Sequence, residues 1–303
     1  MNDFWNSFSR KWTDEQYNPT LWTPRLAANA LLPAHIAFTN EKSERYRNKM
    51  SAHLQTISFG EDEFSGSIDV FRPQNVKEDA PIIVYIHGGW WQWFSKEQFS
   101  YLAEPFNKHG LAVYMPGYRM AQDWENEIPM ESILKQMEYA VAAILNEAVK
   151  RGSPAVYLIG HSAGGQLVTM LNNTDWNKFK LPSPAQQKLK GIFSLAGLFD
   201  IRPLVNSFIN DEIKMSITSA EKVSPQLTPL SSKDHLVPVY LTLPEFDTPE
   251  FFRQTKEYQN KLLKTGQPCH FKVINNRDHL DLIEKLIEDN DELLNYLLEH
   301  MDI

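Results

Sequence analysis

The segment YLIGHSAGGQLVTM, residues 157–170, constrains the fold more than any other part of the chain. An apolar run typical of a strand is followed by the pattern G-x-S-x-G and then by a helical pattern. Glycines at this spacing permit a sharp turn from strand to helix, and the turn exposes a serine hydroxyl at the carboxyl end of the strand. The segment therefore predicts an α/β fold in which Ser162 is a candidate nucleophile.

Short β-rich runs alternate with longer helical patterns along the rest of the chain, which is typical of a mostly parallel sheet flanked by helices. The runs LQTISFG and GSIDVFRP predict an antiparallel hairpin, and PIIVYI predicts a strand buried on both faces. The stretch PMESILKQMEYAVAAILNEAVKRG has apolar residues at three- and four-residue intervals and predicts a long amphipathic helix. Further strands are expected at LAVYMPGYR, AVYLIG, GIFSLAG, VPVYLTLP and HFKVI.

The chain length is compatible with one large α/β domain, so we expect residues 1–303 to form a single unit. Residues 1–50 carry aromatic and apolar positions among charges and are expected to form a helical flank or cap. Residues 198–238 are longer than a simple crossover and rich in proline. We therefore expect a cap-like insertion with short helices near the carboxyl edge of the sheet.

Composition narrows the classes of partner and location. The 42% of apolar residues is enough for a substantial core, and a net charge of −8 provides no general attraction for nucleic acid or anionic lipid. No secretory signal pattern and no membrane-spanning apolar run is found, so a cytoplasmic location is expected. The single Cys269 cannot form an internal disulfide and is expected to pack in the interior.

A serine hydroxyl needs a base, and the base needs a third group to hold its tautomer. In this architecture the chain order is serine, then an acid, then histidine. His279 follows the last predicted strand in a polar turn and is the favoured base. The other histidines after Ser162 are His235, His270 and His300.

The acid is expected after the penultimate strand, where the sequence reads LPEFDTPEF. Asp247 is the leading candidate, although the Thr-Pro-Glu that follows it also suits a helix cap. Glu245 is closer to the strand and stays open as the alternative. Asp200 and Asp234 also follow Ser162 but lie elsewhere relative to the predicted strands.

The motif His87-Gly88-Gly89-Trp90 comes directly after the predicted buried strand. Acyl-transfer chemistry needs backbone N–H donors where negative charge develops, and a loop at this point supplies them together with the residue after the nucleophile. Gly88, Gly89 or Trp90 is therefore expected to share an oxyanion with Ala163, while His87 braces the loop. The tryptophans of this loop are Trp90, Trp91 and Trp93. We expect them to form apolar walls of a substrate pocket, with at least one of them packing in the core instead.

The motifs H-G-G-x-W, G-H-S-A-G-G, LPEFDTPEFFRQTKEY and RDHLDLIEKL together resemble kynurenine formamidases (arylformamidases) of the α/β-hydrolase superfamily, which are related to hormone-sensitive-lipase-like esterases. The resemblance extends from about Tyr17, in EQYNP, to the end of the chain. It implies an α/β-hydrolase fold and the same nucleophile, acid and base as above. Two departures are Gln122, where related esterases usually carry proline, and Gly165-Gln166, where many arylformamidases carry Ala-His.

The resemblance also implies hydrolysis of N-formyl-L-kynurenine to kynurenine and formate without a metal or organic cofactor. The expected partner is a small aromatic formamide or ester, with no nucleic acid and no membrane, and a homodimer stays open. A carboxylesterase acting on small or aromatic esters is the alternative enzyme. A non-catalytic ligand-binding module is the alternative from another class, because a fold alone does not determine function.

Overall fold

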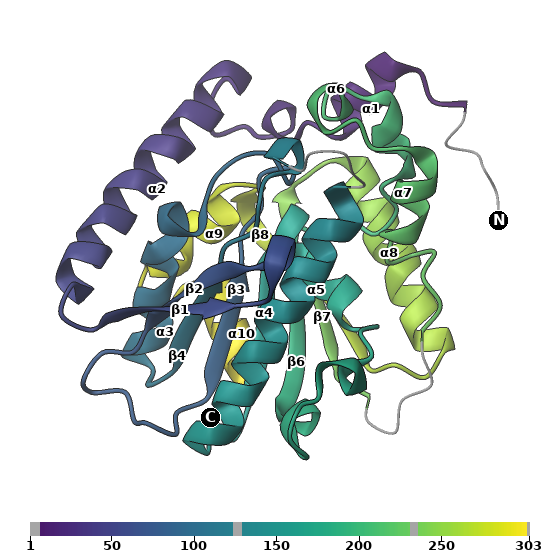
Figure 1. Ribbon diagram of the computed structural model, residues 1–303. Helices are drawn as coiled ribbons and strands as arrows, with labels where there is room; N and C mark the ends of the chain where they lie inside the picture. Colours follow the sequence, from purple (N-terminus) through teal and green to yellow (C-terminus); the bar gives the residue numbers. More distant parts are fainter. Residues whose placement is uncertain (1–6, 124–128, 231–235, 302–303) are drawn as a thin grey trace.

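An eight-stranded sheet in the order β1-β2-β4-β3-β5-β6-β7-β8 forms the centre of the protein, seen here in a computed structural model (Figure 1). The structure describes residues 7–123, 129–230 and 236–301. The strands are β1 Leu54–Phe59, β2 Gly66–Phe71, β3 Ile82–Ile86, β4 Ala112–Pro116, β5 Val156–His161, β6 Leu189–Leu195, β7 Val239–Phe246 and β8 Cys269–Asp278. Strands β3 to β8 run parallel to one another, which confirms the predicted mostly parallel α/β sheet.

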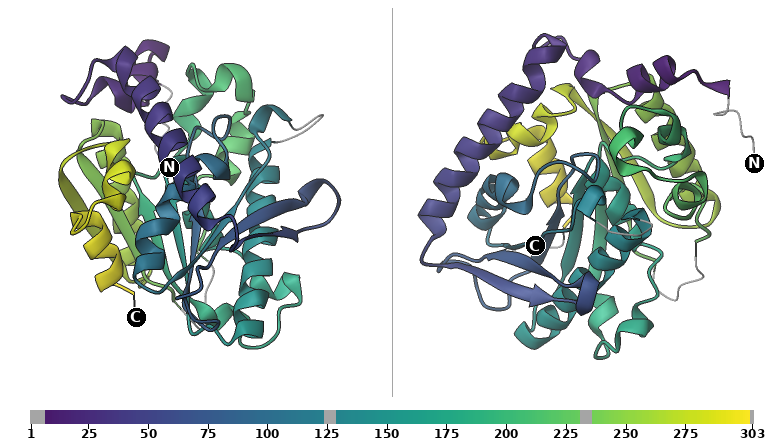
Figure 2. Two further views of the ribbon diagram at one scale, coloured as in Figure 1. Left: turned by 90° about the vertical axis from the view of Figure 1, so that its left-hand side faces the viewer. Right: turned by 45° about the horizontal axis from the view of Figure 1, so that its top comes forward.

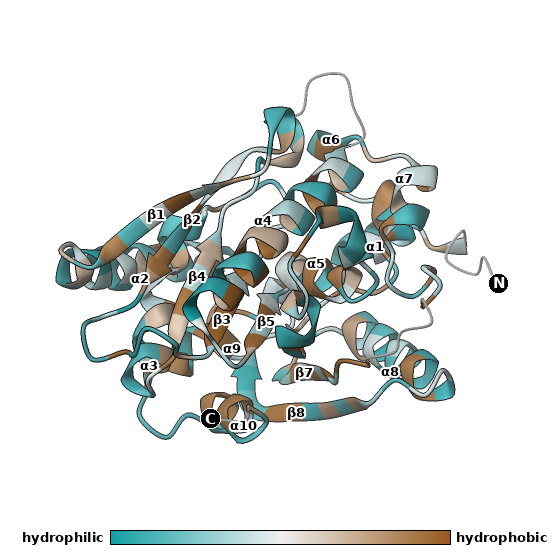
Figure 3. Ribbon diagram, turned by 60° about the horizontal axis from the view of Figure 1, so that its bottom comes forward, coloured by the Kyte–Doolittle hydropathy of each residue, from teal (hydrophilic) through white to brown (hydrophobic). Residues whose placement is uncertain are grey.

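The predicted hairpin forms at one edge of the sheet. Strands β1 and β2 are antiparallel, with Leu54 opposite Phe71 and Phe59 opposite Gly66, and β2 is also antiparallel to β4. Every residue of β3, β4 and β5 is buried, as expected for strands that helices cover on both faces. Figure 3 shows the apolar residues concentrated on these inner strands and on the helices against them.

The helices lie on both faces of the sheet. In Figures 1 and 2, α4 and α5 lie on one face, and α3 and α10 lie on the other. The predicted amphipathic helix is α4, which buries Ile133, Met137 and Val141 at four-residue intervals. The helices are α1 Arg10–Gln16, α2 Ala28–Met50, α3 Ala103–Lys108, α4 Pro129–Arg151, α5 Ala163–Leu171, α6 Asn210–Ile213, α7 Ile217–Lys222, α8 Pro249–Lys264, α9 Asp281–Glu284 and α10 Glu292–Glu299.

The N-terminal flank consists of α1, the short 3₁₀ helix η2 (Pro19–Leu21) and the long α2. Helix α2 buries residues spaced three or four positions apart, namely Leu31, His35, Thr39, Ser43, Tyr46 and Met50. This stripe packs on η4 (Lys96–Leu102), where the Ser43 hydroxyl donates to the carbonyl of Gln98 and accepts from the N–H of Tyr101. The flank is therefore part of the folded body, and none of the helices in the described ranges is long and apolar enough to cross a membrane.

The segment between β6 and β7 carries the short helices η8 (Arg202–Asn206), α6 and α7. It contacts the N-terminal flank, because Asp14 of α1 accepts the N–H of Phe208 and Arg10 pairs with Asp211. Figure 1 shows α1 and α6 side by side above the carboxyl ends of the strands. Residues 198–238, for which we expected a cap-like insertion, thus contain three short helices in their described part, and residues 231–235 lie outside it.

Candidate active site

Ser162 occupies the turn between β5 and α5. Its backbone has φ 55° and ψ −118°, a conformation that costs a non-glycine residue about 1–3 kcal/mol. The turn is stabilised by the Ser162 N–H, which donates to the carbonyl of Leu195 on the neighbouring strand β6 at 2.8 Å. The G-x-S-x-G pattern thus forms the predicted strand–turn–helix, and the strained turn presents the Ser162 side chain at the carboxyl edge of the sheet.

Two glycines allow this turn to pack closely. A Cβ on Gly164 would lie 2.1 Å from the carbonyl oxygen of Ile86, so no side chain fits where α5 crosses β3. A Cβ on Gly88 would lie 2.7 Å from the carbonyl oxygen of His161 and 3.0 Å from the Cβ of Ser162. The backbone of the loop after β3 therefore passes directly against the candidate nucleophile.

His279 and Asp247 meet because they follow neighbouring parallel strands, β8 and β7. The Nδ1–H of His279 donates to Oδ2 of Asp247 at 2.9 Å, and the two side chains are 4% and 0% exposed. Oδ1 of Asp247 accepts the N–H of Thr248 at 2.8 Å, which orients the carboxylate. With Nδ1 protonated, Nε2 of His279 remains as the basic nitrogen.

Glu245 is not the partner of the imidazole in this structure. It is exposed, and its carboxylate accepts the N–H of Asn276 at 2.8 Å. Asp200, the other candidate acid that lies in the described part, pairs with Arg202 at 2.8 Å. His270 stacks on Tyr240, and His300 donates from Nδ1 to the carbonyl of Tyr296. Two further candidates, Asp234 and His235, lie outside the described residues.

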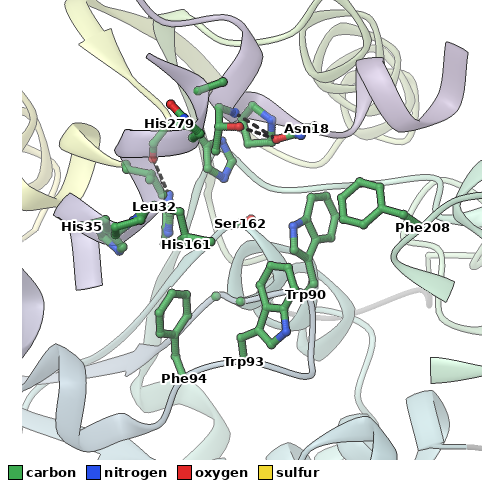
Figure 4. Close-up of a pocket in the computed structure, with 18 of the residues that line it drawn as sticks. Asn18, Leu32, His35, Trp90, Trp93, Phe94, His161, Ser162, Phe208 and His279 are labelled. Atoms are coloured by element: carbon green, nitrogen blue, oxygen red, sulfur yellow. Dashed lines mark hydrogen bonds between the residues drawn. The ribbon is translucent and has the colours of Figure 1, made fainter. Parts of the chain in front are cut away.

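A cavity of about 280 Å³ opens beside Ser162 and His279. Figure 4 shows the rings of Trp90, Trp93 and Phe94 on one side of Ser162 and His279 on the other. The lining residues are Asn18, Pro19, Thr20, Ala28, Asn29, Leu32, Pro33, His35, Gly88, Gly89, Trp90, Trp93, Phe94, Phe99, His161, Ser162, Phe208, His279 and Leu280. The walls are thus mostly aromatic and aliphatic, as is typical of sites that bind small molecules.

The prediction that Trp91 lines the pocket is wrong. Trp91 is 0% exposed, and its Nε1–H donates to Oε1 of Gln166 in the core at 3.1 Å. Trp90 and Trp93 do line the cavity, and the turn between them directs the intervening ring inward. Gln166 also donates from Nε2 to the carbonyl of Val223. Its side chain therefore links the loop after β3 to the segment between β6 and β7.

The loop after β3 has free backbone donors at the cavity. Gly88, Gly89 and Trp90 line the cavity, and their N–H groups make no hydrogen bond within the described ranges. Ala163 is fully buried and is the first residue of α5. The first N–H groups of a helix have no partner within the helix, so the Ala163 N–H can donate to another group. These are the four residues expected to hold an oxyanion, and the structure gathers them around Ser162.

His87 lies behind this loop. Its Nδ1–H donates to the carbonyl of Gly88 at 2.8 Å, and its ring is stacked between Phe99 and Tyr118. Burial lowers the pKa of His87 to about 4, so the ring is neutral at physiological pH. The neutral ring is held between two aromatic rings and donates to Gly88, so it can support the loop after β3, as we expected.

His161 and His279 are linked through the backbone. The Nε2–H of His161 donates to the carbonyl of His279 at 2.8 Å, and the ring centroids lie 4.8 Å apart. Burial and the neighbouring His279 lower the pKa of His161 well below its usual range. The neutral His161 side chain, at the end of β5, therefore fixes the backbone of His279 relative to the turn that carries Ser162.

The N-terminal flank contributes residues that the sequence alone did not single out. Asn18, Asn29 and His35 line the cavity, and Nδ1 of His35 bonds Oε1 of Glu284 at 2.7 Å. No local pattern marks these residues as part of a cavity, because Ser162 and His279 lie far along the chain from them. Within the described ranges, no group of three or more His, Cys, Asp or Glu residues is placed to hold a metal ion.

The chain resembles known proteins in sequence and in fold. Residues 68–234, more than half of the chain, match the family model BD-FAE. The chain is 31% identical to the kynurenine formamidase of Danio rerio over 301 residues, covering 99% of this chain and 98% of that protein. It is 29% identical to the kynurenine formamidase of Salmo salar, covering 98% of each. A crystal structure of a Silicibacter sp. protein assigned as a thioesterase has a TM-score of 0.75 at 23% identity, covering 93% of this chain and 97% of that one.

Proposed function

Because the chain belongs to the kynurenine formamidase family of α/β-hydrolases, we propose that it hydrolyses N-formyl-L-kynurenine to L-kynurenine and formate. The single observation that carries the proposal is the His279–Asp247 hydrogen bond of 2.9 Å beside Ser162, at a cavity with aromatic walls. An aryl formamide presents an aromatic ring to such walls and a small carbonyl to the serine. The same family relationship makes the protein an enzyme of the arylformamidase or esterase type.

The first half of the reaction forms a formyl-enzyme. His279 takes the proton of Ser162 through Nε2 while the serine oxygen attacks the formyl carbon, and Asp247 stabilises the imidazolium. The negative charge on the formyl oxygen is held by backbone N–H groups of Ala163 and of the loop 88–90. His279 then gives its proton to the aryl nitrogen as the C–N bond breaks, because an arylamide anion is a poor leaving group.

The second half releases formate by the same groups. A water molecule gives a proton to His279 and attacks the formyl carbon, and the same backbone donors hold the new oxyanion. The C–O bond to the serine breaks, and its oxygen takes the proton back from His279. The free arylamine and formic acid leave, the acid releases its proton to water and becomes formate, and the serine and the neutral histidine are restored.

The experiment compares kcat/KM for N-formyl-L-kynurenine, p-nitrophenyl acetate and p-nitrophenyl butyrate, in the wild type and in Ser162→Ala. The proposal expects strong formamide turnover that disappears in Ser162→Ala. Turnover of the esters without the formamide would leave the serine chemistry in place and make the protein a carboxylesterase instead.

A fluorophosphonate probe separates both enzymes from a binding module. The probe reacts with an activated serine, so we expect it to label the wild type and not Ser162→Ala. A folded wild-type protein that stays unlabelled and turns over neither substrate class would contradict the proposed chemistry.

A further inference from the structure

The polar part of the cavity comes from one short region of the chain. Apart from Ser162, the histidines and the indole N–H groups of Trp90 and Trp93, its polar side chains among the described residues are those of Asn18, Thr20 and Asn29. No Lys, Arg, Asp or Glu of the described ranges lines the cavity. Figure 4 shows Asn18 on the opposite side of Ser162 from Trp93 and Phe94. The cavity therefore has an aromatic side and a polar, uncharged side.

Asn18 presents hydrogen-bond donors. Its Oδ1 accepts from both the backbone N–H of Thr20, at 3.3 Å, and the Thr20 hydroxyl, at 2.7 Å. A backbone N–H can only donate, so the amide oxygen must face Thr20 and the NH₂ group faces away from it. This NH₂ group has no partner in the described part of the chain, and Asn18 is only half-buried. It can donate to an oxygen of a ligand.

Asn29 presents acceptors. In a regular helix, the carbonyl of residue 29 would accept the N–H of residue 33, but residue 33 is Pro33 and has no N–H. Both Asn29 and Pro33 line the cavity, and Asn29 is an exposed residue in the first turn of α2, with a carbonyl that has no helical N–H to accept. Together with Asn18, they offer donors and acceptors in one place without any net charge.

Two arginines of the N-terminal flank are already paired with carboxylates. Arg25 bonds Asp278 and Glu284 at 2.7 Å each, and Arg10 pairs with Asp211. A ligand with a single net charge would therefore lose hydration in this cavity without meeting an opposite charge, which is costly. A zwitterion neutralises its own charges and needs only hydrogen bonds.

We propose that Asn18, Thr20 and Asn29 form a neutral head-group subsite, which selects aromatic ligands whose side chain ends in a hydrogen-bonding group without net charge, such as a zwitterionic α-amino acid. The inference rests on the proposed function, since it assumes that the aromatic ring of the substrate lies at the tryptophan side. The ligand carboxylate would accept from the Asn18 NH₂ group, and the ammonium would donate to the Asn29 carbonyl.

The test measures binding by calorimetry, with the wild-type protein and amines that carry no formyl group. L-kynurenine is zwitterionic, kynuramine lacks the carboxylate and is a cation, and 4-(2-aminophenyl)-4-oxobutanoate lacks the α-amino group and is an anion. We expect L-kynurenine to bind about fivefold or more tightly than either charged analogue. Equal affinities for the three ligands would overturn the proposal.

Two variants locate the preference. Asn18→Leu keeps the size of the side chain and removes its donors, so the affinity for L-kynurenine should fall about fivefold, while 2-aminoacetophenone, which has no head group, binds as before. Asn29→Asp adds a negative charge, so kynuramine should bind about three- to tenfold more tightly and the anionic analogue more weakly. If neither variant changes the ratios between ligands, the subsite is not where we place it.

Asn48→Asp is the matched control. Asn48 is an exposed residue of the same helix α2, about 28 Å further along the axis, where salt screens its effect on the cavity. Because nothing is cleaved, binding is independent of the formamidase assay. Formamide turnover without the ligand preference would overturn only the subsite, and the preference without formamide turnover would overturn only the proposed function.

Discussion

The guanidinium of Arg25 donates two hydrogen bonds to the carboxylate of Asp278, the residue directly before His279. Its Nε lies 2.7 Å from Oδ2 and its Nη2 lies 3.2 Å from Oδ1. The same carboxylate accepts the N–H groups of Leu280 and Asp281, and so it shapes the turn that carries the candidate base. Burial raises the pKa of Asp278, but the hydrogen bonds from Arg25 and its other partners outweigh burial and hold the pKa below its usual range.

Removing Arg25 should therefore impair both stability and turnover. Arg25→Ala leaves the Asp278 carboxylate, which is 1% exposed, without its cation. We expect the free energy of unfolding to fall by about 1–3 kcal/mol, as for a buried polar group that loses its partner. We expect kcat/KM to fall about tenfold through misplacement of His279. Urea unfolding and steady-state assays measure the two effects.

Arg10→Ala is the control for Arg25→Ala. Arg10 also pairs with a carboxylate, that of Asp211, but the two side chains are 49% and 53% exposed. Exposed pairs contribute little to stability. We expect no measurable change in Tm or kcat, and a loss as large as that of Arg25→Ala would show that the flank acts through its surface charge instead.

Asp247→Asn should reduce kcat by about 10³–10⁴, because an amide cannot stabilise the imidazolium and favours the wrong tautomer. Glu245→Gln should leave kcat almost unchanged, since Glu245 contacts the backbone of Asn276 and not the imidazole. Circular dichroism checks that both variants are folded. A severe loss in Glu245→Gln with Asp247→Asn still active would reverse the assignment of the acid.

Trp90→Gly should broaden the range of acyl groups that the enzyme accepts. Trp90 lines the cavity beside Ser162, and its φ of 53° is a conformation that glycine adopts freely, so the variant is expected to fold. We expect the ratio of kcat/KM for p-nitrophenyl butyrate to that for the acetate to rise about tenfold. Leu263→Ala, at an exposed position of α8 that does not line the cavity, serves as the control and should leave the ratio unchanged. An unaltered chain-length profile in Trp90→Gly would contradict this role.

The neutral state of His87 makes stability depend on pH. Burial lowers its pKa in the folded protein to about 4, whereas an unfolded histidine titrates at about 6.5. Between these values the unfolded chain binds more protons, so the stability from a neutral His87 is complete above about pH 6.5 and is lost as the pH falls towards 4. The loss amounts to about 3 kcal/mol for this group.

His87→Phe tests this pH dependence, because it keeps a ring between Phe99 and Tyr118 but cannot be protonated. Urea unfolding at pH 7, 5.5 and 4 should show a smaller loss of stability on acidification than in the wild type. His53→Gln, at an exposed position, should retain the wild-type slope. An identical dependence of stability on pH in His87→Phe and the wild type would mean that His87 binds the same number of protons in the folded and the unfolded protein, and would contradict this prediction.

Much of the fold and of the candidate site could be predicted from sequence, because the deciding interactions are local. The turn at Ser162 depends on glycines within two residues of it, and the hairpin of β1 and β2 depends on a short connection. Asp247 and His279 could be placed because each directly follows a strand, and the carboxyl ends of parallel strands meet at one edge of a sheet.

Side-chain direction could not be predicted in the same way. Trp90, Trp91 and Trp93 share one turn, and only packing against Gln166 decides that Trp91 faces the core. Likewise, Glu245 and Asp247 are two residues apart, and the bend at the end of β7 directs one to Asn276 and the other to His279.

The sequence by itself determined the outline of the candidate site, namely a serine on a sharp turn with candidate acids and a histidine after later strands, because each of these features depends on residues close to it in the chain. Only the tertiary structure decided what surrounds that machinery. Arg25 reaches Asp278 across 253 positions, and Asn18 and Asn29 reach the cavity beside Ser162. Such contacts arise when helices and loops pack on the finished sheet, so no local pattern encodes them.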